Sequence, residues 1–279
     1  MEVVRAAVVG HVEWVEFVSV DHVPARGEIV HACDWWDEPG GGGAGGAVQL
    51  QKLTGGAAFF TALGDDALGR AARERLTTTG LRVEAAVRPE PSRRAVTFVD
   101  PSGERTITVL GARLAPSADD ALPWSDLADA EAVYFTAGDE GALRAARRAR
   151  VLVATTRVLP LLAGAGVQLD AVVGSALDAD EAYTPGDLDP APGLAVLTEG
   201  EGGGTYVTSD GVAARFDAVA PPGPVVDRYG AGDSFAAGLT YALGRGDAPA
   251  AAVAFAARCG AAAVTGRGPY AGQLTAADV

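Results

Sequence analysis

The chain has 279 residues, 48% of them hydrophobic, and is therefore long enough to bury the core of one large α/β domain. Its formal net charge of −14, from 36 acidic and 22 basic residues, disfavours binding to nucleic acid or to an anionic membrane through a general positive field. An anionic ligand such as ATP would have to be held by local backbone donors and a metal ion.

The N-terminal residues 3–9 form a strand-like apolar run and not a signal peptide, and the longest apolar runs are broken by glycine or charge. We therefore expect a cytoplasmic protein. Cys33 and Cys259 lie far apart without the spacing of metal ligands, which favours reduced thiols. A P-loop kinase is excluded because Gly-x-x-x-x-Gly-Lys-Ser/Thr is absent, and Lys52 is the single lysine.

After Gly10, residues 12–18 alternate apolar and polar side chains as a strand would, and residues 28–32 resemble a second short strand. A glycine run at residues 40–46 then precedes a helical pattern at 48–53. Glycines before a helix let the backbone approach a ligand and leave N–H groups free for it, although a flexible loop would have the same composition.

Residues 57–63 are typical of a buried strand, and the helix expected over 66–79 ends at Gly80. Residues 94–100 and 105–110, joined by a Pro-Ser-Gly-Glu turn, predict a hairpin. With the strands at 12–18 and 28–32, this hairpin could form a small sheet apart from the main one. An antiparallel edge of the main sheet is the alternative.

From Glu131 onward, strands and helices alternate, which predicts a parallel sheet with helices on both faces. The expected strands are residues 133–136, 151–154, 171–174 and 195–198, and the expected helices are residues 140–150 and 158–164. Ligands of such sheets bind at the carboxyl ends of the strands. The loops after Gly10, Thr136, Ser175 and Thr198 should meet there.

Residues 225–243 combine a strand ending, the small residues Gly230, Ala231 and Gly232, the acid Asp233, and a helix. The first N–H groups of a helix have no internal partner, so this turn could bind a phosphate. A carboxylate beside a phosphate needs a separate role, and Asp233 could act as a general base that takes a proton from an alcohol. A simple helix cap is the alternative.

This stretch resembles the signature Asp-Thr-x-Gly-Ala-Gly-Asp-x-Phe-x-x-Gly of the ribokinase-like carbohydrate kinases, the phosphofructokinase-B family. The matching residues are Asp227, Gly230, Ala231, Gly232, Asp233, Phe235 and Gly238, and Arg228 replaces the usual Thr. The glycine run resembles the family pattern Gly-Gly-x-x-x-Asn-x-Ala at Gly40, Gly41 and Ala47. The resemblance covers nearly the whole chain.

The resemblance implies one ribokinase-like α/β domain over residues 1–279, with a mostly parallel central sheet flanked by helices. It also implies a small β-sheet lid over the acceptor, made of the strands near 12–18, 28–32, 94–100 and 105–110, through which a homodimer could form. The implied activity is ATP-dependent phosphorylation of a hydroxymethyl group on a sugar or sugar-like molecule, with ATP and Mg²⁺ as cofactors. No nucleic acid or membrane partner is expected.

The resemblance also assigns roles to individual residues. Asp233 would be the catalytic base, beside the turn of Gly230, Ala231 and Gly232. The acceptor site would comprise Glu13, Gly40, Gly41, Gly42 and Asp233. The nucleotide site would comprise Thr198, Gly200, Gly203, Gly230 and Gly232. Asp178 and Glu181 would hold Mg²⁺ through water, since they align with the family motif Asn-x-x-Glu.

The chain departs from the family at the acceptor. Glu13 and Val15 stand where relatives have Asn and Asp, and Gly45 replaces a sugar-binding Asn, which argues against a simple ribose-type acceptor. One alternative is a nucleoside kinase in which Trp14, Trp35 or Trp36 stacks on the base. Another is a non-catalytic sensor of sugar or nucleotide. Arg228 could replace the monovalent cation that some relatives bind near Asp227.

Overall fold

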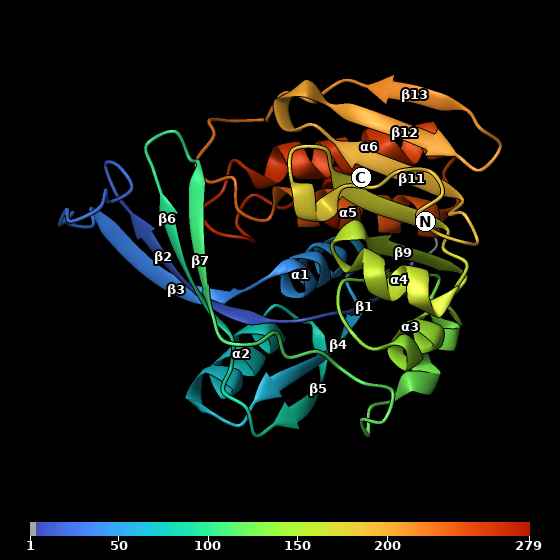
Figure 1. The fold of residues 1–279 in the computed structure, drawn as a ribbon, viewed down its shortest axis with the longest axis horizontal. Coiled ribbons are helices and arrows are strands. Elements are labelled where there is room, and N and C mark those ends of the chain that lie inside the picture. The colour runs from blue at the N-terminus through green and yellow to red at the C-terminus, as the bar shows by residue number, and fades with distance from the viewer. Residues whose placement is uncertain (1–3) are drawn as a thin grey trace.

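The computed structural model describes residues 4–279, and most of its strands form one sheet of nine (Figure 1). In spatial order they are β13 (Ala213–Phe216), β12 (Gly204–Thr208), β11 (Leu194–Thr198), β10 (Ala171–Ser175), β9 (Val151–Thr155), β8 (Ala132–Phe135), β1 (Ala6–Val9), β4 (Ala57–Gly64) and β5 (Arg82–Arg88). The strands from β11 to β5 run parallel, and β12 runs antiparallel to both of its neighbours, β11 and β13. The predicted, mostly parallel sheet is confirmed.

Helices cover both faces of this sheet because its strands are apolar on both sides. In β1, Ala6 and Val8 face one core, whereas Ala7 and Val9 face the other. The first core is covered by α1 (Gly42–Thr54), α2 (Ala67–Thr78), α5 (Ala231–Arg245) and α6 (Pro249–Ala263). The second is covered by the 3₁₀ turn η1 (Trp124–Asp129), α3 (Glu140–Ala146) and α4 (Leu159–Ala165). None of the helices within residues 4–279 is long and apolar enough to cross a membrane.

The strand order reverses at β1, which lies between β4 and β8. In a parallel sheet, such a reversal opens a crevice at the carboxyl ends of the strands. Gly10 follows β1 and Thr136 follows β8 at this edge, and Thr136 N donates to the carbonyl of Val9 at 2.8 Å. By this rule, we expect a ligand site beside Gly10 and Thr136.

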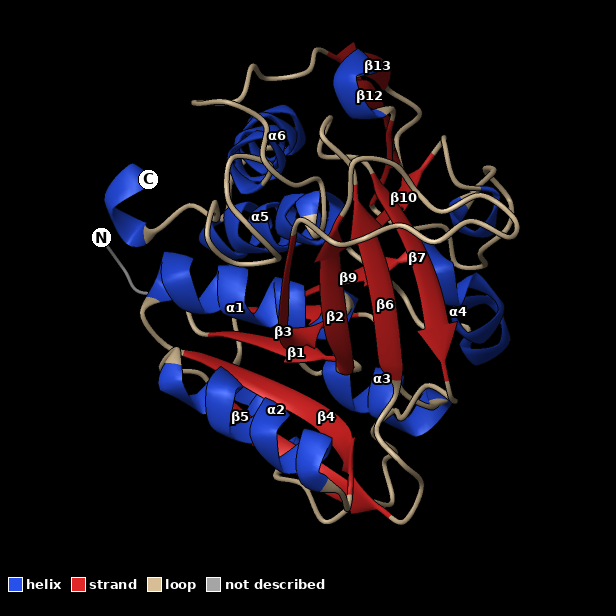
Figure 2. Cartoon of the chain, turned by 90° about the vertical axis from the view of Figure 1, so that its left-hand side faces the viewer, coloured by secondary structure: helices blue, strands red, loops and turns tan. Residues whose placement is uncertain are grey.

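A second sheet of four strands lies beside the main domain and faces the viewer in Figure 2. Its order is β3 (Asp34–Gly40), β2 (Glu13–Ser19), β6 (Arg94–Val99) and β7 (Arg105–Leu110). The hairpin β6–β7 confirms the prediction from residues 94–110, and β2 pairs with β6 in parallel. This sheet is the lid, and a homodimer through it stays a prediction.

One lid strand differs from expectation. Residues 28–32 form no strand, and Ile29 is 86% exposed; the strand that pairs with β2 is instead Asp34–Gly40. Its sequence, with two adjacent tryptophans, three acids and Pro39, does not alternate as a strand usually does. Because β3 is an edge strand, it tolerates a proline.

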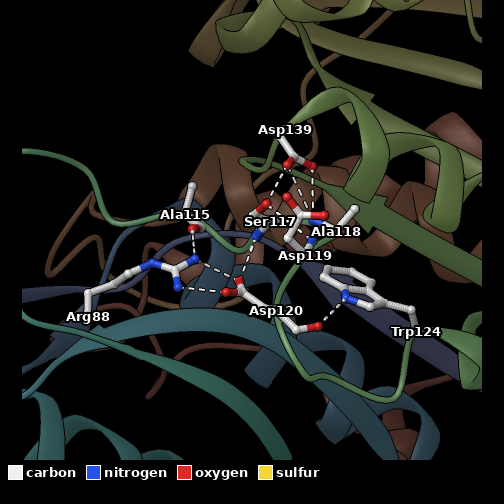
Figure 3. Close-up of polar contacts among 8 residues, drawn as sticks. All are labelled: Arg88, Ala115, Ser117, Ala118, Asp119, Asp120, Trp124 and Asp139. Carbon is white, nitrogen blue, oxygen red and sulfur yellow. Dashed lines mark hydrogen bonds and ion pairs between the residues drawn. The ribbon is translucent and has the colours of Figure 1, made fainter.

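A connector over residues 111–123 leads from the lid back to the main sheet and is fixed by two polar contacts (Figure 3). Arg88 at the end of β5 donates to both carboxylate oxygens of Asp120, at 2.6 and 2.7 Å. Ser117 Oγ donates at 2.6 Å to Asp139, which also caps α3. The connector is therefore fastened both to the edge strand β5 and to the start of α3.

Helix α1 begins inside the glycine run and not after it. Gly41, with φ of 85°, is the N-cap residue, and the helix starts at Gly42. A Cβ atom at Gly43 would lie 2.6 Å from the backbone nitrogen of His11 and would also overlap its carbonyl oxygen. The run is therefore a close packing surface, not a flexible loop.

This packing makes a stability prediction. Gly43→Ala should lower the free energy of unfolding by about 1–3 kcal/mol, because the added methyl group meets backbone atoms that have no room to move. Gly56→Ala is the matched control, since apart from its chain neighbours nothing in residues 4–279 lies within 4 Å of its Cβ position, and it should change stability by less than about 0.5 kcal/mol. Urea unfolding followed by circular dichroism measures both; equal midpoints would contradict the packing argument.

Candidate active site

The start of α5 lies at the carboxyl edge of the main sheet and presents free backbone donors. Gly230, with φ of 76°, is the N-cap residue, and the first helical hydrogen bond runs from Ser234 N to Gly230 O at 2.9 Å. The amides of Ala231, Gly232 and Asp233 therefore have no carbonyl one turn back. Gly232 is exposed, and no atom of the described chain outside its own helix turn lies within 4 Å of its Cβ position, so this side of the turn is unobstructed.

The carboxylate of Asp233 lies against the first turn of α1. A Cβ atom at Gly42 would be 2.8 Å from Asp233 Oδ1, and one at Gly45 would be 3.3 Å from Asp233 Cβ. Burial raises the pKa of Asp233 to about 6, and the negative charge of Glu181 raises it further, whereas Arg105 and Arg157 oppose the shift. The structure therefore brings together the predicted residues Gly42, Gly230, Ala231, Gly232 and Asp233.

Glu13 is buried on the lid side of this site. Its Oε1 accepts a hydrogen bond from Tyr229 Oη at 3.3 Å, and its Oε2 lies 3.1 Å from Arg93 Nε. Tyr229 Oη in turn accepts from the amide of Gly41 at 3.0 Å. Burial raises the pKa of Glu13, and Arg93 opposes this shift. Glu13 thus connects the lid, the glycine run and the loop before α5.

His11 is a site residue that the sequence did not reveal. It is only 6% exposed, and its Nδ1 has no hydrogen-bond partner within residues 4–279. Burial lowers its pKa to about 3, helped by the positive charges of Arg113, Arg93 and Arg157, so the imidazole is neutral. The Oγ1 of Thr136 is likewise buried without a partner in the described chain. Both polar atoms are therefore unsatisfied within the described chain.

Asp178 and Glu181, the predicted magnesium residues, share one arginine. Arg157, which follows β9, donates to Asp178 Oδ2 at 2.7 Å and to Glu181 Oε1. Arg157 carries no motif; its place after the predicted strand 151–154 was the only signal in the sequence. No group of three or more His, Cys, Asp or Glu residues within 4–279 is arranged to cage a metal. A Mg²⁺ ion that keeps most of its waters needs only one or two carboxylates from the protein, so the magnesium role of Asp178 and Glu181 stays a prediction.

The predicted nucleotide loop follows β11. Thr198 Oγ1 donates to the carbonyl of Gly174 at 3.2 Å, and residues 200–202 form a 3₁₀ turn. Gly203, with φ of 81°, lies so close to the next hairpin that its Cβ would be 2.8 Å from Ala218 N. Glu201 in this loop accepts a hydrogen bond from Arg228 Nη2 at 2.6 Å. That contact brings the loop next to the turn before α5.

Arg228 does not pair with Asp227. The buried carboxylate of Asp227 accepts from the amides of Tyr229 and Gly268, at 2.8 and 3.0 Å. The guanidinium of Arg228 instead meets Glu201 and, at 3.8 Å, Glu104 of the lid turn. The hypothesis that Arg228 replaces a monovalent cation beside Asp227 thus gains no support from the geometry.

The three tryptophans considered for stacking on a base all belong to lid strands, Trp14 to β2 and Trp35 and Trp36 to β3. Trp14 is 5% exposed and lies under the Arg75 guanidinium at 4.7 Å. Trp36 stacks on Phe17 at 4.8 Å, and the Arg267 guanidinium lies 3.8 Å from its ring centre. Trp35 is 70% exposed. Neither Trp14 nor Trp36 is therefore free to stack on a base as placed here.

The sequence matches known proteins over most of its length. A model of the pfkB family of carbohydrate kinases matches residues 5–185 and 187–276. Aminoimidazole riboside kinase of Salmonella typhimurium is 28% identical over 92% of this chain and 91% of its own length.

Two solved ribokinases share the fold. The enzyme from Thermotoga maritima has a TM-score of 0.78 at 21% identity, covering 99% of this chain and 97% of its own. The enzyme from Arabidopsis thaliana, solved with ribose and ATP, has a TM-score of 0.76 at 20% identity with the same coverage. At such identities the likeness shows the fold, and it confirms the ribokinase-like architecture.

Proposed function

Because the chain belongs to the pfkB family of carbohydrate kinases, we propose that it phosphorylates a hydroxymethyl group of a sugar-like acceptor with ATP, using Asp233 as base. One observation carries the assignment of the base. The Asp233 carboxylate lies between the open amide turn that begins α5 and the side-chain-free start of α1. A non-catalytic sensor would need no carboxylate at the point where a phosphate is held.

The reacting atoms would lie between the Asp233 carboxylate and the amides of the turn that begins α5. Asp233 removes the proton from the acceptor hydroxyl as that oxygen attacks the terminal phosphorus of ATP, and the bond from this phosphorus to the bridging oxygen breaks, so that ADP leaves. A pKa of about 6 leaves Asp233 ionised at neutral pH yet more basic than an ordinary aspartate. The amides of the turn from Gly230 to Gly232 stabilise the negative charge of the phosphoryl group during transfer.

The nucleotide and its metal would lie beside the ends of β10 and β11. Thr198, Gly200 and Gly203 would contact the nucleotide phosphates, and Asp178 and Glu181 would hold Mg²⁺ through water. When bound, Mg²⁺ neutralises charge on the phosphates. Arg157 keeps the two carboxylates in place and holds the pKa of Asp178 below its usual range.

The acceptor would lie under the lid, against Glu13 and the backbone of Gly40, Gly41 and Gly42. A nucleoside acceptor is the second candidate, because the Salmonella relative is named for a riboside. The covered faces of Trp14 and Trp36 favour the sugar-like acceptor.

Removing the base tests the assignment. Asp233→Asn should lower kcat about 10²- to 10⁴-fold, the usual contribution of a general base, while Mg-ADP still raises the melting temperature. ADP release is measured with a panel of sugars, sugar acids, sugar phosphates and nucleosides. The exposed Asp180→Asn serves as the control and should keep full activity. Full activity in Asp233→Asn would refute the assignment.

The raised pKa of Asp233 gives a pH dependence. The base works only as a carboxylate, so kcat/KM should fall about tenfold per pH unit below about pH 6 and level off above about pH 7. Rates with a neutral acceptor between about pH 5 and pH 8 measure this. A profile that is flat down to about pH 5 would show that Asp233 is not the titrating base.

Glu181→Gln should act on the metal and on the base together. Losing an outer carboxylate should raise the Mg²⁺ concentration needed for half-maximal rate roughly 10- to 100-fold. Removing its charge should also move the Asp233 inflection to lower pH, because Glu181 raises that pKa. Magnesium titrations and pH profiles measure both, with Asp180→Asn as the control. If neither moves, Glu181 lies outside the reacting site.

A further inference from the structure

We propose that the acceptor carries an anionic group, a carboxylate or a phosphate, that binds Arg113 together with Arg93 and His11. This inference rests on the proposed function, because it concerns the acceptor of the same site. The anionic group would occupy the lid-hinge end of the crevice, and the hydroxyl to be phosphorylated would lie at Asp233.

Arg113 is the first reason. It is half-buried, and within residues 4–279 its guanidinium forms no hydrogen bond or ion pair; its Nε is fully buried. Withdrawing a charge from water without a partner is costly. Burial lowers the pKa of Arg113, and the neighbouring positive charges of Arg93 and Arg157 lower it further, whereas the charge of Glu13 opposes the shift. A bound anion would remove both penalties.

The charge balance around Arg113 is the second reason. Glu13 already pairs with Arg93 at 3.1 Å, and Asp178 and Glu181 already pair with Arg157. Arg113 therefore has no carboxylate of its own in the described chain. With a net charge of −14, the molecule as a whole repels anions, so a local excess of positive charge is not a general property of its surface.

His11 supplies an independent observation. Its imidazole is 94% buried, and Nδ1 has no partner among residues 4–279. Arg113, Arg93 and Arg157 all lie close enough to shift its titration. A neutral imidazole can donate one N–H to an anion that the arginines hold.

The segments that carry these three side chains are held in place by the fold. Arg93 directly precedes β6, Arg113 lies on the connector after β7, and His11 follows β1. The connector is fastened by the Arg88–Asp120 and Ser117–Asp139 contacts (Figure 3). Preorganised donors of this kind discriminate well between charged and neutral ligands.

The test compares matched acceptors in ADP-release assays with Mg-ATP. Hexonates and pentonates are each measured against the alditol of the same chain length, and sugar monophosphates against the parent sugar. We expect one anionic class to exceed its neutral partners in kcat/KM by roughly tenfold or more, and the two arms identify which class. Equal or better turnover of the neutral partners would overturn the inference and leave the kinase assignment standing.

Variants then assign the effect to Arg113. Arg113→Gln should lower kcat/KM for the anionic acceptor roughly 10- to 100-fold, and for its neutral partner much less. Arg113→Lys should recover part of the loss. Arg94→Gln is the matched control, because Arg94 directly follows Arg93 but is exposed and paired with Glu16, and it should leave the ratio unchanged.

Two other results are decisive. If Arg113→Gln slows both members of a pair equally, or weakens Mg-ADP binding, Arg113 does not serve the acceptor's anionic group and the inference fails. If no acceptor is phosphorylated, the proposed function fails, and calorimetry with the same anions decides the inference alone. Binding that depends on Arg113 would support it, and no binding would overturn it.

Discussion

The site depends on one constraint, the four glycines Gly42, Gly43, Gly45 and Gly46 in the first turns of α1. Gly42 and Gly45 lie against Asp233, Gly43 lies against the backbone of His11, and a Cβ at Gly46 would be 2.8 Å from the Tyr134 ring. Side chains there would push α1 away from α5 and from the end of β1. The Asp233 carboxylate would then be more hydrated, and its pKa would move back toward that of an ordinary aspartate.

Much of this arrangement could be predicted from the sequence. The parallel sheet follows from strand and helix periodicity, and the turn at residues 230–232 combines glycines, an acid and a helix start in one continuous segment. Strand β3 was missed because its residues do not alternate, and the start of α1 was missed because glycine has poor helix propensity. In both places tertiary packing, which local sequence does not encode, decides the structure.

The arginines of the site could not be found in this way. Arg93, Arg113 and Arg157 come from three separate segments and belong to no motif, and the chain has many other arginines. Their importance comes from which acids they meet, which only the fold determines. Asp233 itself was predicted from the sequence, but its pKa depends on the fold. Burial and the charge of Glu181 raise this pKa, whereas Arg105 and Arg157 oppose the shift.

Arg228 links the tip of the lid to the loop that leads into α5. The Arg228 amide donates to the carbonyl of Gly103 in the lid turn, and Arg105 Nη1 donates to the carbonyl of Arg228, both at 3.1 Å. Lifting the lid tip breaks these bonds and frees the loop that leads into the phosphate turn. Linkage is reciprocal, so a ligand that holds the lid tip against this loop would also stabilise the turn.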